Sequence, residues 1–482
     1  MKRFVLFIPS LLAVFPSLFI FFKNKDVIDI PFYIILFLLF GIGTTLFLCL
    51  LIFKFFIKND SIAVVMSVIA VLAVFYYGYF YEIIITGFGN FSLNRHIEVI
   101  LIWSGCMISL WFLAWRIKKN ADFLCKIICI FTMVLFTVFL IFIAVDNVQK
   151  ILSKNSKIIS MENAEEAFSL DYVNSFLGYA PDVYYIVPDG YENASVLEKF
   201  FGYDNREFFS HLEQKGFVII KNSESNYPNT LFSMPATLNM EYMDKLIADP
   251  SLDSLLVRKK IFEKSNVSDL FENFGYQYVA IASDNTSFSG DEADVRFGPN
   301  LLFRLFIKPT IFDPFSRRFR SRILNAFNSF NEASALSSPK FVLAHIIAPH
   351  DPYVFGPNGE RIGINTGAAH SENDMKLYLG QLKFVNKELE RAIDVILKNS
   401  IRPPIIIIQS DHGVSLPDSY GAENVQDARL KNLSAFLLPK KAENLPSSNI
   451  NTFRFIFDYY FGTSFGLLEN KKKISGLFVN RK

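Results

Sequence analysis

The sequence predicts an N-terminal multi-spanning α-helical membrane domain followed by a C-terminal α/β domain with a mostly parallel sheet. Two observations carry this prediction. Five long apolar stretches precede Asp146, and nearly all charged residues in this part lie between the stretches. After Asp146, short apolar runs alternate with segments of helical periodicity, which is typical of a parallel sheet covered on both faces. We therefore expect a transmembrane domain of five helices (1–145), a linker (146–181) and an α/β domain (182–482).

Each of the five stretches is long enough to cross a bilayer, which needs about 20 apolar residues. They are approximately Phe4–Phe22, Pro31–Phe53, Ser61–Ile85, Val99–Trp115 and Ile127–Val145. The first stretch lacks the small-residue cleavage pattern of a signal peptide, so we interpret it as a retained anchor. With five spans, Lys and Arg are more frequent in the segments on the same side of the membrane as the N-terminus than in the segments on the opposite side. This bias predicts a cytoplasmic N-terminus. Five crossings then place the α/β domain outside the cytoplasm, in a multi-pass protein of the plasma (inner) membrane.

Charge and cysteine content exclude some classes of protein. The net charge is +2, so there is no basic excess to neutralise phosphates, and a nucleic-acid partner is not expected. All four Cys lie in or beside the apolar stretches, so the α/β domain has no disulfide.

Five short apolar runs predict the strands of the α/β domain: Val183–Val187, Phe217–Ile220, Tyr276–Ala282, Phe341–Ile347 and Ile405–Ile408. Helices are predicted at Asn205–Lys215, Val267–Phe274 and Asp374–Lys398. The run of four Ile indicates a strand buried on both faces, as in a parallel sheet. Ligands bind at the carboxyl ends of strands in such sheets, so the residues that follow each strand are candidate site residues.

Polar side chains follow three of these strands. Asp411 and His412 follow the Ile run, and an Asp-His pair suits zinc or manganese. Asp189 follows the first strand, although its Pro-Asp-Gly setting also suits an ordinary turn. The strand that contains His345 leads into a Pro-bounded loop with His350, and two His in one sheet favour a functional role.

A fourth candidate is a hydroxyl at the start of a predicted helix. Thr230 follows the extended Tyr227-Pro228 segment and opens an apolar helical pattern. Backbone N–H groups and the helix dipole favour an anion there, which suits a nucleophile that receives a phosphoryl group. An ordinary Thr N-cap would give the same pattern, and Ser233 and Thr237 are competing hydroxyls.

Asp189, Thr230, His350, Asp411 and His412 occur in the order and with the chemistry of a known family. The α/β domain resembles the sulfatase-like branch of the alkaline phosphatase superfamily, most specifically in the Asp-His-Gly strand end and the His-x4-His-Asp-Pro stretch. With its preceding membrane helices, the chain is similar to the membrane-anchored lipoteichoic acid synthases and lipid A phosphoethanolamine transferases.

The resemblance implies a role for each candidate. Asp189, Thr230, Asp411 and His412 would ligate a divalent metal, Zn or Mn, with Thr230 also the nucleophile, and His350 would hold the substrate. Asp189 departs from these transferases, which usually have Glu, towards the sulfatase pattern. Sulfatases proper make formylglycine within a C/S-x-P-x-R motif, and residues 233–237 start that motif but end in Thr. Sulfate-ester hydrolysis by formylglycine is therefore disfavoured.

The implied function is metal-dependent transfer of a phospholipid head group, of the phosphoglycerol or phosphoethanolamine type, onto a cell-envelope glycan or lipid. The donor would be a membrane phospholipid, and a phosphothreonine would be the intermediate. One alternative is a membrane-anchored sulfatase-like hydrolase or phosphodiesterase with water as the acceptor. Another is a catalytically silent binding module, against which the presence of Asp189, Asp411 and His412 argues.

Overall fold

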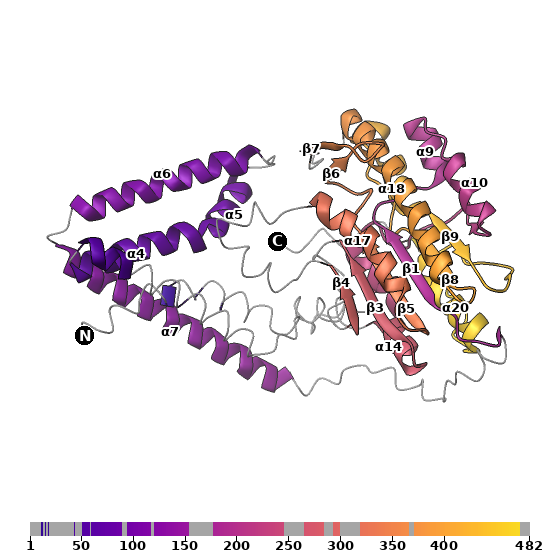
Figure 1. Cartoon of the computed structure of the whole chain (residues 1–482), viewed down its shortest axis with the longest axis horizontal. Coiled ribbons are helices and arrows are strands. Elements are labelled where there is room, and N and C mark those ends of the chain that lie inside the picture. Colours follow the sequence, from indigo (N-terminus) through magenta and orange to yellow (C-terminus); the bar gives the residue numbers. More distant parts are fainter. Residues whose placement is uncertain are drawn as a thin grey trace. The chain divides into compact units, whose positions relative to one another are not determined.

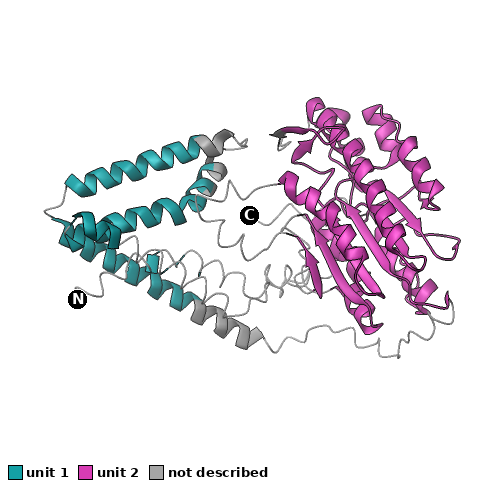
Figure 2. Cartoon of the chain, in the orientation of Figure 1, with its two compact units in different colours: residues 1–162, 300–317 teal, residues 163–299, 318–482 magenta. Residues whose placement is uncertain are grey.

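The structure is a computed structural model of the whole chain. It describes residues 11–12, 15, 18, 43, 51–57, 59–88, 94–116, 120–153, 177–244, 265–283, 293–298, 319–365 and 371–472. The chain divides into two compact units, which are described separately (Figure 2). Unit 1 comprises residues 1–162 and 300–317, and unit 2 comprises residues 163–299 and 318–482.

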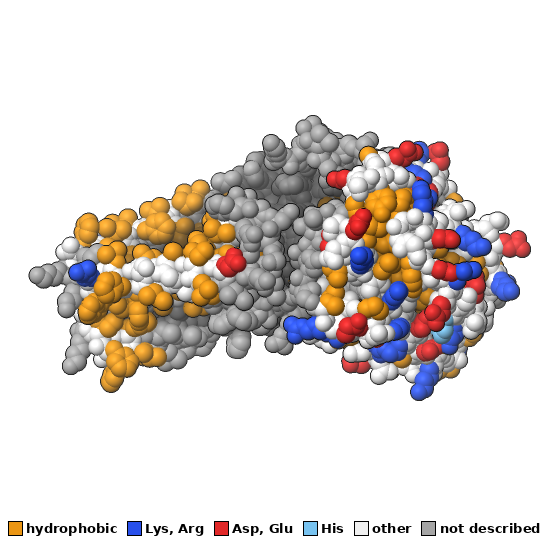
Figure 3. Space-filling model, turned by 90° about the horizontal axis from the view of Figure 1, so that it is seen from above, with side chains coloured by type: hydrophobic (Ala, Val, Ile, Leu, Met, Phe, Trp, Pro, Cys, Tyr) orange, Lys and Arg blue, Asp and Glu red, His pale blue; other side chains and the backbone are white. Residues whose placement is uncertain are grey.

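The described part of unit 1 is helical (Figure 1). Its helices are α4 (Asp60–Phe75), α5 (Tyr77–Phe88), α6 (Asn94–Arg116) and α7 (Ala121–Ser153). By length and composition, two described segments could cross a membrane, Glu98–Arg116 and Ala121–Phe142. On the face drawn in Figure 3, hydrophobic side chains cover much of the described surface of unit 1, whereas charged side chains of both signs are scattered over unit 2. The first two predicted spans lie largely outside the described residues, so the five-helix membrane domain stays a prediction.

The third predicted span, Ser61–Ile85, is not one continuous helix. α4 ends at Phe75 and α5 begins at Tyr77, because Tyr76 leaves the helical region with φ −114° and ψ 1°. The Trp103 indole donates to the carbonyl oxygen of Ala73 at 2.9 Å, which satisfies an acceptor at the end of α4. The Trp103 side chain of α6 thus stabilises the break between α4 and α5, which the apolar pattern of the sequence alone does not indicate.

Unit 2 is built on a seven-stranded sheet with the order β2-β9-β8-β1-β5-β3-β4. The five strands from β8 to β4 run parallel. β9 pairs antiparallel with β8, and the edge strand β2 pairs antiparallel with β9, so β9 alone runs against the other strands of this sheet. The sheet strands are β1 (Val183–Pro188), β2 (Val218–Ile219), β3 (Gln277–Ala282), β4 (Val295–Phe297), β5 (Lys340–Ile346), β8 (Ile405–Gln409) and β9 (Ser434–Leu437). β6 (Tyr353–Phe355) and β7 (Arg361–Asn365) pair in a separate antiparallel ribbon. The predicted α/β class with a mostly parallel sheet is confirmed.

Helices cover both faces of this sheet. One core contains residues of α9 (Ala194–Phe201), α10 (Arg206–Gln214), α17 (Phe319–Ser334) and α18 (Glu372–Asn399). The other contains residues of α11 (Thr230–Asn239), α14 (Asn266–Asn273) and α20 (Thr452–Phe461). The central strand alternates between them, with Tyr184 in the first core and Val183 and Tyr185 in the second. Because both faces are buried, β1 and β8 need apolar residues at every position, which explains their continuous apolar runs.

The order of the strands positions the site. β1 lies between β8 and β5, and all three run in the same direction. Their carboxyl ends therefore meet at one edge of the sheet, where the chain continues into Asp189, the loop with His350, and Asp411. The short helix α19 (Ala422–Leu430) follows the loop after β8 and leads into β9.

Candidate active site

Asp189 lies in the turn that follows β1, and it is buried. Its backbone N–H donates to Ile346 O at 2.8 Å, and its carbonyl oxygen accepts from His350 N at 2.9 Å, which ties the turn to the end of β5. Gly190 completes the turn with φ +69°, a conformation that glycine adopts without strain. The Pro-Asp-Gly turn is therefore present, and it also carries a buried carboxylate.

Asp411 and His412 follow β8 and are fully buried. Asp411 Oδ1 accepts a hydrogen bond from Gly190 N at 3.1 Å, so the loops after β1 and β8 are joined directly. His412 Nδ1 lies 2.8 Å from Gly413 O, and donation to that carbonyl leaves the lone pair on Nε2. His412 Nε2 lies 3.3 Å from Asp411 Oδ2 and 3.8 Å from Asp189 Oδ1, so it faces both carboxylates.

Position 413, in the Asp-His-Gly turn, has no room for a side chain larger than that of glycine. A Cβ on Gly413 would lie 2.0 Å from Ala428 O and 2.4 Å from Lys431 O. The loop after β8 therefore passes against the backbone at the end of α19, where no side chain fits. Substitution would displace the two residues that precede this glycine.

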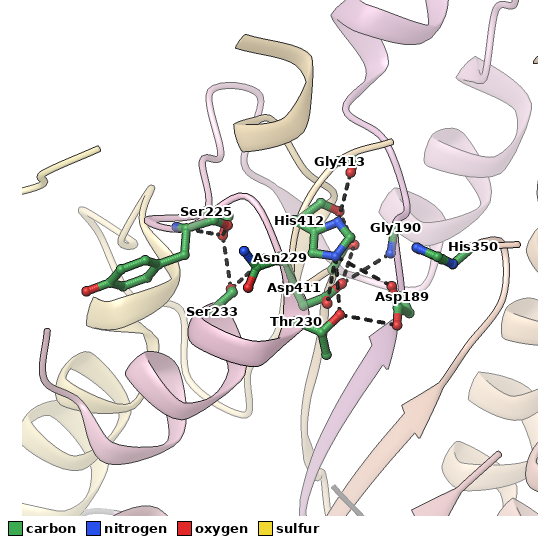
Figure 4. Close-up of polar contacts among 12 residues, drawn as sticks. Asp189, Gly190, Ser225, Asn229, Thr230, Ser233, His350, Asp411, His412 and Gly413 are labelled. Atoms are coloured by element: carbon green, nitrogen blue, oxygen red, sulfur yellow. Dashed lines mark hydrogen bonds and ion pairs between the residues drawn. The ribbon is translucent and has the colours of Figure 1, made fainter. Parts of the chain in front are cut away.

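Thr230 is the first residue of α11 and is not its N-cap. Asn229 caps the helix, since its side chain accepts from Phe232 N at 3.2 Å. The Thr230 hydroxyl instead lies 3.2 Å from His412 Nε2 and 3.5 Å from Asp189 Oδ2 (Figure 4). The alternative of an ordinary Thr cap is therefore wrong, because the residue before it does the capping.

The donor set of this cluster suits a divalent cation. One ligand atom each from Asp189, Asp411 and His412 lies within 4.8 Å of the others. Asp189 Oδ1 and Asp411 Oδ2 are buried without a hydrogen-bond donor among the described residues, and buried carboxylates otherwise require compensation. Burial lowers the pKa of His412 to about 4, so its imidazole is neutral near pH 7, as a metal ligand must be. Thr230 Oγ1 would complete a set of three oxygens and one nitrogen, the ligand types that zinc and manganese accept.

Two further histidines contact Asp189 or its surroundings. His345 lies at the end of β5, and its Nε2 is 3.4 Å from Asp189 Oδ2. Burial opposes the charged form of Asp189, but His350 and His345 hold the pKa of this carboxyl below its ordinary range. His350 is half-buried, with its ring centroid 6.0 Å from that of His412. Burial also opposes the charged form of His350, but Asp189 and Asp351 raise its pKa, which favours the protonated form near neutral pH.

A known protein family matches the part of the chain that contains this site. The family model described as Sulfatase matches residues 182–448, which is more than half of the chain. The chain belongs to the sulfatase family. The match begins directly before β1 and includes all five candidate residues. No curated protein matches the chain.

Solved structures similar to this sulfatase-family chain include periplasmic domains. The C-terminal periplasmic domain of EcEptC from Escherichia coli, in complex with Zn, is 12% identical, with 63% of this chain and 89% of that chain covered and a TM-score of 0.42. The corresponding domain of the phosphoethanolamine transferase EptC from Campylobacter jejuni is 13% identical, with 58% and 90% covered and a TM-score of 0.40. A protein in the alkaline phosphatase superfamily from Vibrio parahaemolyticus is 14% identical, with 59% and 67% covered and a TM-score of 0.41.

The competing hydroxyls of this sulfatase-family chain have structural partners. Ser233 is buried, and its hydroxyl donates to Asp411 O while lying 2.9 Å from Ser225 Oγ (Figure 4). Thr237 donates to Ser233 O at 2.8 Å. Because Ser233 is occupied in holding the backbone of Asp411, Thr230 is the hydroxyl that faces the cluster.

Two asparagines that the sequence alone does not indicate position the loop after β8. Asn449 Nδ2 donates to Ser410 O at 2.9 Å, and Asn432 Nδ2 also donates to that carbonyl. Asn432 donates in addition to Asn449 Oδ1 at 2.9 Å, and Ser223 Oγ donates to Asn432 Oδ1 at 2.7 Å. All three side chains are buried, so the backbone that precedes Asp411 is fixed by hydrogen bonds from distant segments.

Replacing Asn449 by alanine should lower the metal affinity by about 10- to 100-fold, as loss of an outer hydrogen bond to a metal site typically does. Asn451→Ala is the matched control, since Asn451 is also buried but bonds Ser448 Oγ and Leu468 O instead. Both variants should unfold more readily, by about 1–3 kcal/mol. Metal titration of the purified proteins checks the difference, and equal metal affinities of the two variants would contradict the positioning role.

Proposed function

We propose that the protein is a membrane-bound, metal-dependent phosphotransferase that moves a phospholipid head group, of the phosphoglycerol or phosphoethanolamine type, onto a cell-envelope glycan or lipid. The observation that carries this proposal is the Thr230 hydroxyl. This hydroxyl lies at the N-terminus of α11 but does not cap the helix. Thr230 Oγ1 is 3.5 Å from Asp189 Oδ2 and 3.2 Å from His412 Nε2. A nucleophile in this setting suits transfer of a group by way of a phosphothreonine.

In the proposed reaction, Thr230 Oγ attacks the phosphorus of the lipid and diacylglycerol leaves with its oxygen. A divalent metal, Zn or Mn, held by Asp189, Thr230, Asp411 and His412 would lower the pKa of the hydroxyl and offset charge on the phosphoryl oxygens. His350 carries the proton that the leaving alkoxide needs, and Asp189 and Asp351 favour that protonated form. The acceptor hydroxyl then attacks the phosphorus and gives its proton to the neutral His350, while the bond from phosphorus to Thr230 Oγ breaks and restores the nucleophile.

Unit 1 supports a membrane location for this reaction. Many large apolar side chains of α6 and α7 are exposed, among them Leu101, Ile108, Phe131 and Leu140. Such a surface is unfavourable in water, and two segments of these helices are long enough to span a bilayer. A multi-pass anchor in the plasma membrane, with unit 2 outside the cytoplasm, would hold the enzyme in the same bilayer as its phospholipid donor.

Hydrolysis is the second candidate, and the match to the sulfatase family favours it. The same residues would serve, with water in place of the acceptor hydroxyl. A formylglycine mechanism does not fit, since Ser233 is buried and bonded to Asp411 O.

The testing experiment incubates purified full-length protein with Zn or Mn and with vesicles of fluorescent phosphatidylglycerol or phosphatidylethanolamine. We expect release of fluorescent diacylglycerol from one of these lipids, and no release by Thr230→Ala. A glycan or lipid acceptor that gains the head group establishes transfer, whereas release of the free head group establishes hydrolysis. A metal-loaded protein that acts on neither lipid would overturn the proposed donor.

A further inference from the structure

One buried side chain of α18 holds the loop that carries His350. Gln381 is fully buried, and its Nε2 donates to His350 O at 2.8 Å and to Pro349 O at 3.2 Å. Its Oε1 accepts from Val354 N at 2.9 Å and from Phe355 N at 3.3 Å. Because carbonyls lie on one side of the amide and N–H groups on the other, its orientation is fixed. Gln381 therefore ties the His350 backbone and the start of β6 to one helix.

The same face of α18 holds the turn that carries Asp189. Tyr378 precedes Gln381 by three residues, and residues at this spacing lie on one side of a helix. The Tyr378 side chain is fully buried, and its hydroxyl donates to Gly190 O and accepts from Glu192 N, both at 3.0 Å. The loops after β1 and β5 are therefore attached to neighbouring points of the same helix.

These two loops also contact each other at His350. His350 N donates to Asp189 O at 2.9 Å, and a Cβ on Gly190 would lie 3.4 Å from both Cβ and Cδ2 of His350 (Figure 4). The imidazole is half-buried, and its Nδ1 lies 2.8 Å from Asp351 O. The direction of the imidazole thus depends on where its own backbone lies, and Gln381 bonds the carbonyl oxygen of that backbone.

We infer that Gln381 is a positioning residue that keeps His350 where its proton can reach the oxygen of the leaving diacylglycerol. This inference rests on the proposed function, in which the bond between phosphorus and that oxygen breaks and His350 gives the oxygen its proton. An alkoxide leaves poorly without a proton, whereas the less basic thiolate leaves readily without one. Displacement of the loop should therefore slow the departure of an oxygen leaving group and spare that of a sulfur leaving group.

The test compares two lipids with the purified, Mn-loaded full-length protein. The oxygen lipid is the phosphatidylglycerol or phosphatidylethanolamine that the protein cleaves. The sulfur lipid is its analogue with sulfur in place of the oxygen between phosphorus and diacylglycerol. Gln381→Met should lower kcat for the oxygen lipid by about 100-fold, the scale of a misplaced catalytic group, and kcat for the sulfur lipid by less than about threefold. The affinity for Mn should stay within about threefold, since the metal ligands lie on other segments.

A second variant and a control separate positioning from a general loss of structure. Gln381→Glu keeps an acceptor for the two N–H groups of β6 but has no amide donor for the loop, so it should show the same dependence on the leaving group. Asn386→Leu is the matched control on the same helix, because Asn386 is also buried but accepts from Tyr191 Oη and donates to Asn205 Oδ1. Any loss of kcat in this control should be equal for the two lipids.

Hydrogen exchange adds a readout that needs no reaction. The backbone amide of His350 should exchange faster in both Gln381 variants than in the unaltered protein, and not in Asn386→Leu. Unchanged exchange in the Gln381 variants, equal losses of kcat for the two lipids, or a fall of Mn affinity together with kcat would each overturn the inference. Faster exchange in a protein that releases no diacylglycerol would establish that Gln381 fixes His350 and would reject the proposed phospholipid donor.

Discussion

Replacement of Thr230 by alanine is expected to lower turnover by about 10⁴-fold or more, which is the scale for loss of a nucleophile. The hydroxyl lies 3.2 Å from His412 Nε2 and has no capping role, so the substitution removes chemistry rather than a helix cap. Thr230→Ser should keep a measurable fraction of the activity, because a hydroxyl remains at the same place. Steady-state rates of diacylglycerol release measure both effects.

Ser233→Ala is the matched control for Thr230, one turn further along α11. Its loss leaves the buried Asp411 O without this donor, which should cost about 1–3 kcal/mol of unfolding free energy. Turnover should stay within about tenfold of the unaltered protein, since the nucleophile is intact. The opposite pattern, with Ser233→Ala inactive and stably folded while Thr230→Ala retains activity, would move the nucleophile to Ser233.

Asp411→Asn should abolish tight metal binding. The affinity for Zn or Mn should fall by more than about 100-fold, which exceeds the loss expected when a residue that only supports a metal ligand is replaced. The side chain is fully buried, with Oδ1 held by Gly190 N and Oδ2 turned towards His412 Nε2. An asparagine side chain has nearly the same shape as that of aspartate and keeps one oxygen acceptor, but it carries no charge. The apo protein should therefore be no less stable, because the variant loses a buried charge whose Oδ2 has no hydrogen-bond donor among the described residues.

The measurement for Asp411→Asn is the melting temperature with and without added metal, together with the metal content of the purified protein. Metal should raise the melting temperature of the unaltered protein and not that of the variant, because ligand binding stabilises only a folded state that binds. Asp394→Asn, an exposed carboxylate paired with Lys215, is the control and should respond to metal normally. An equal metal response of Asp411→Asn would show that the cluster is not the metal site.

The central strands and the polar residues that follow them were predictable because each is marked by a short continuous segment of the sequence. A strand buried on both faces must be apolar at each position, so the Ile run marks β8, and Asp411 and His412 follow it directly. Parallel neighbours then bring the end of β1 to the same edge of the sheet. This local reasoning placed Asp189 correctly beside the pair, but the roles of these residues stay proposals.

The supporting residues were not predictable in the same way. Asn432 and Asn449 act through hydrogen bonds to the carbonyl oxygen of Ser410, and no spacing in the sequence records such contacts. β9 was not predicted although residues 435–438 are apolar, because this short strand pairs antiparallel with β8 and lies outside the alternation of parallel strands and helices. The identity of the true cap of α11 also required coordinates, since Asn229 and Thr230 are both good capping residues.

Peptide mass spectrometry can identify the residue that carries the head group during the reaction. The unaltered protein is incubated with metal and donor lipid in the absence of an acceptor and is then denatured and digested. We expect a head-group phosphate on Thr230 that disappears when the acceptor is added. Head-group release without any adduct on Thr230, or an adduct on Ser233, would contradict it.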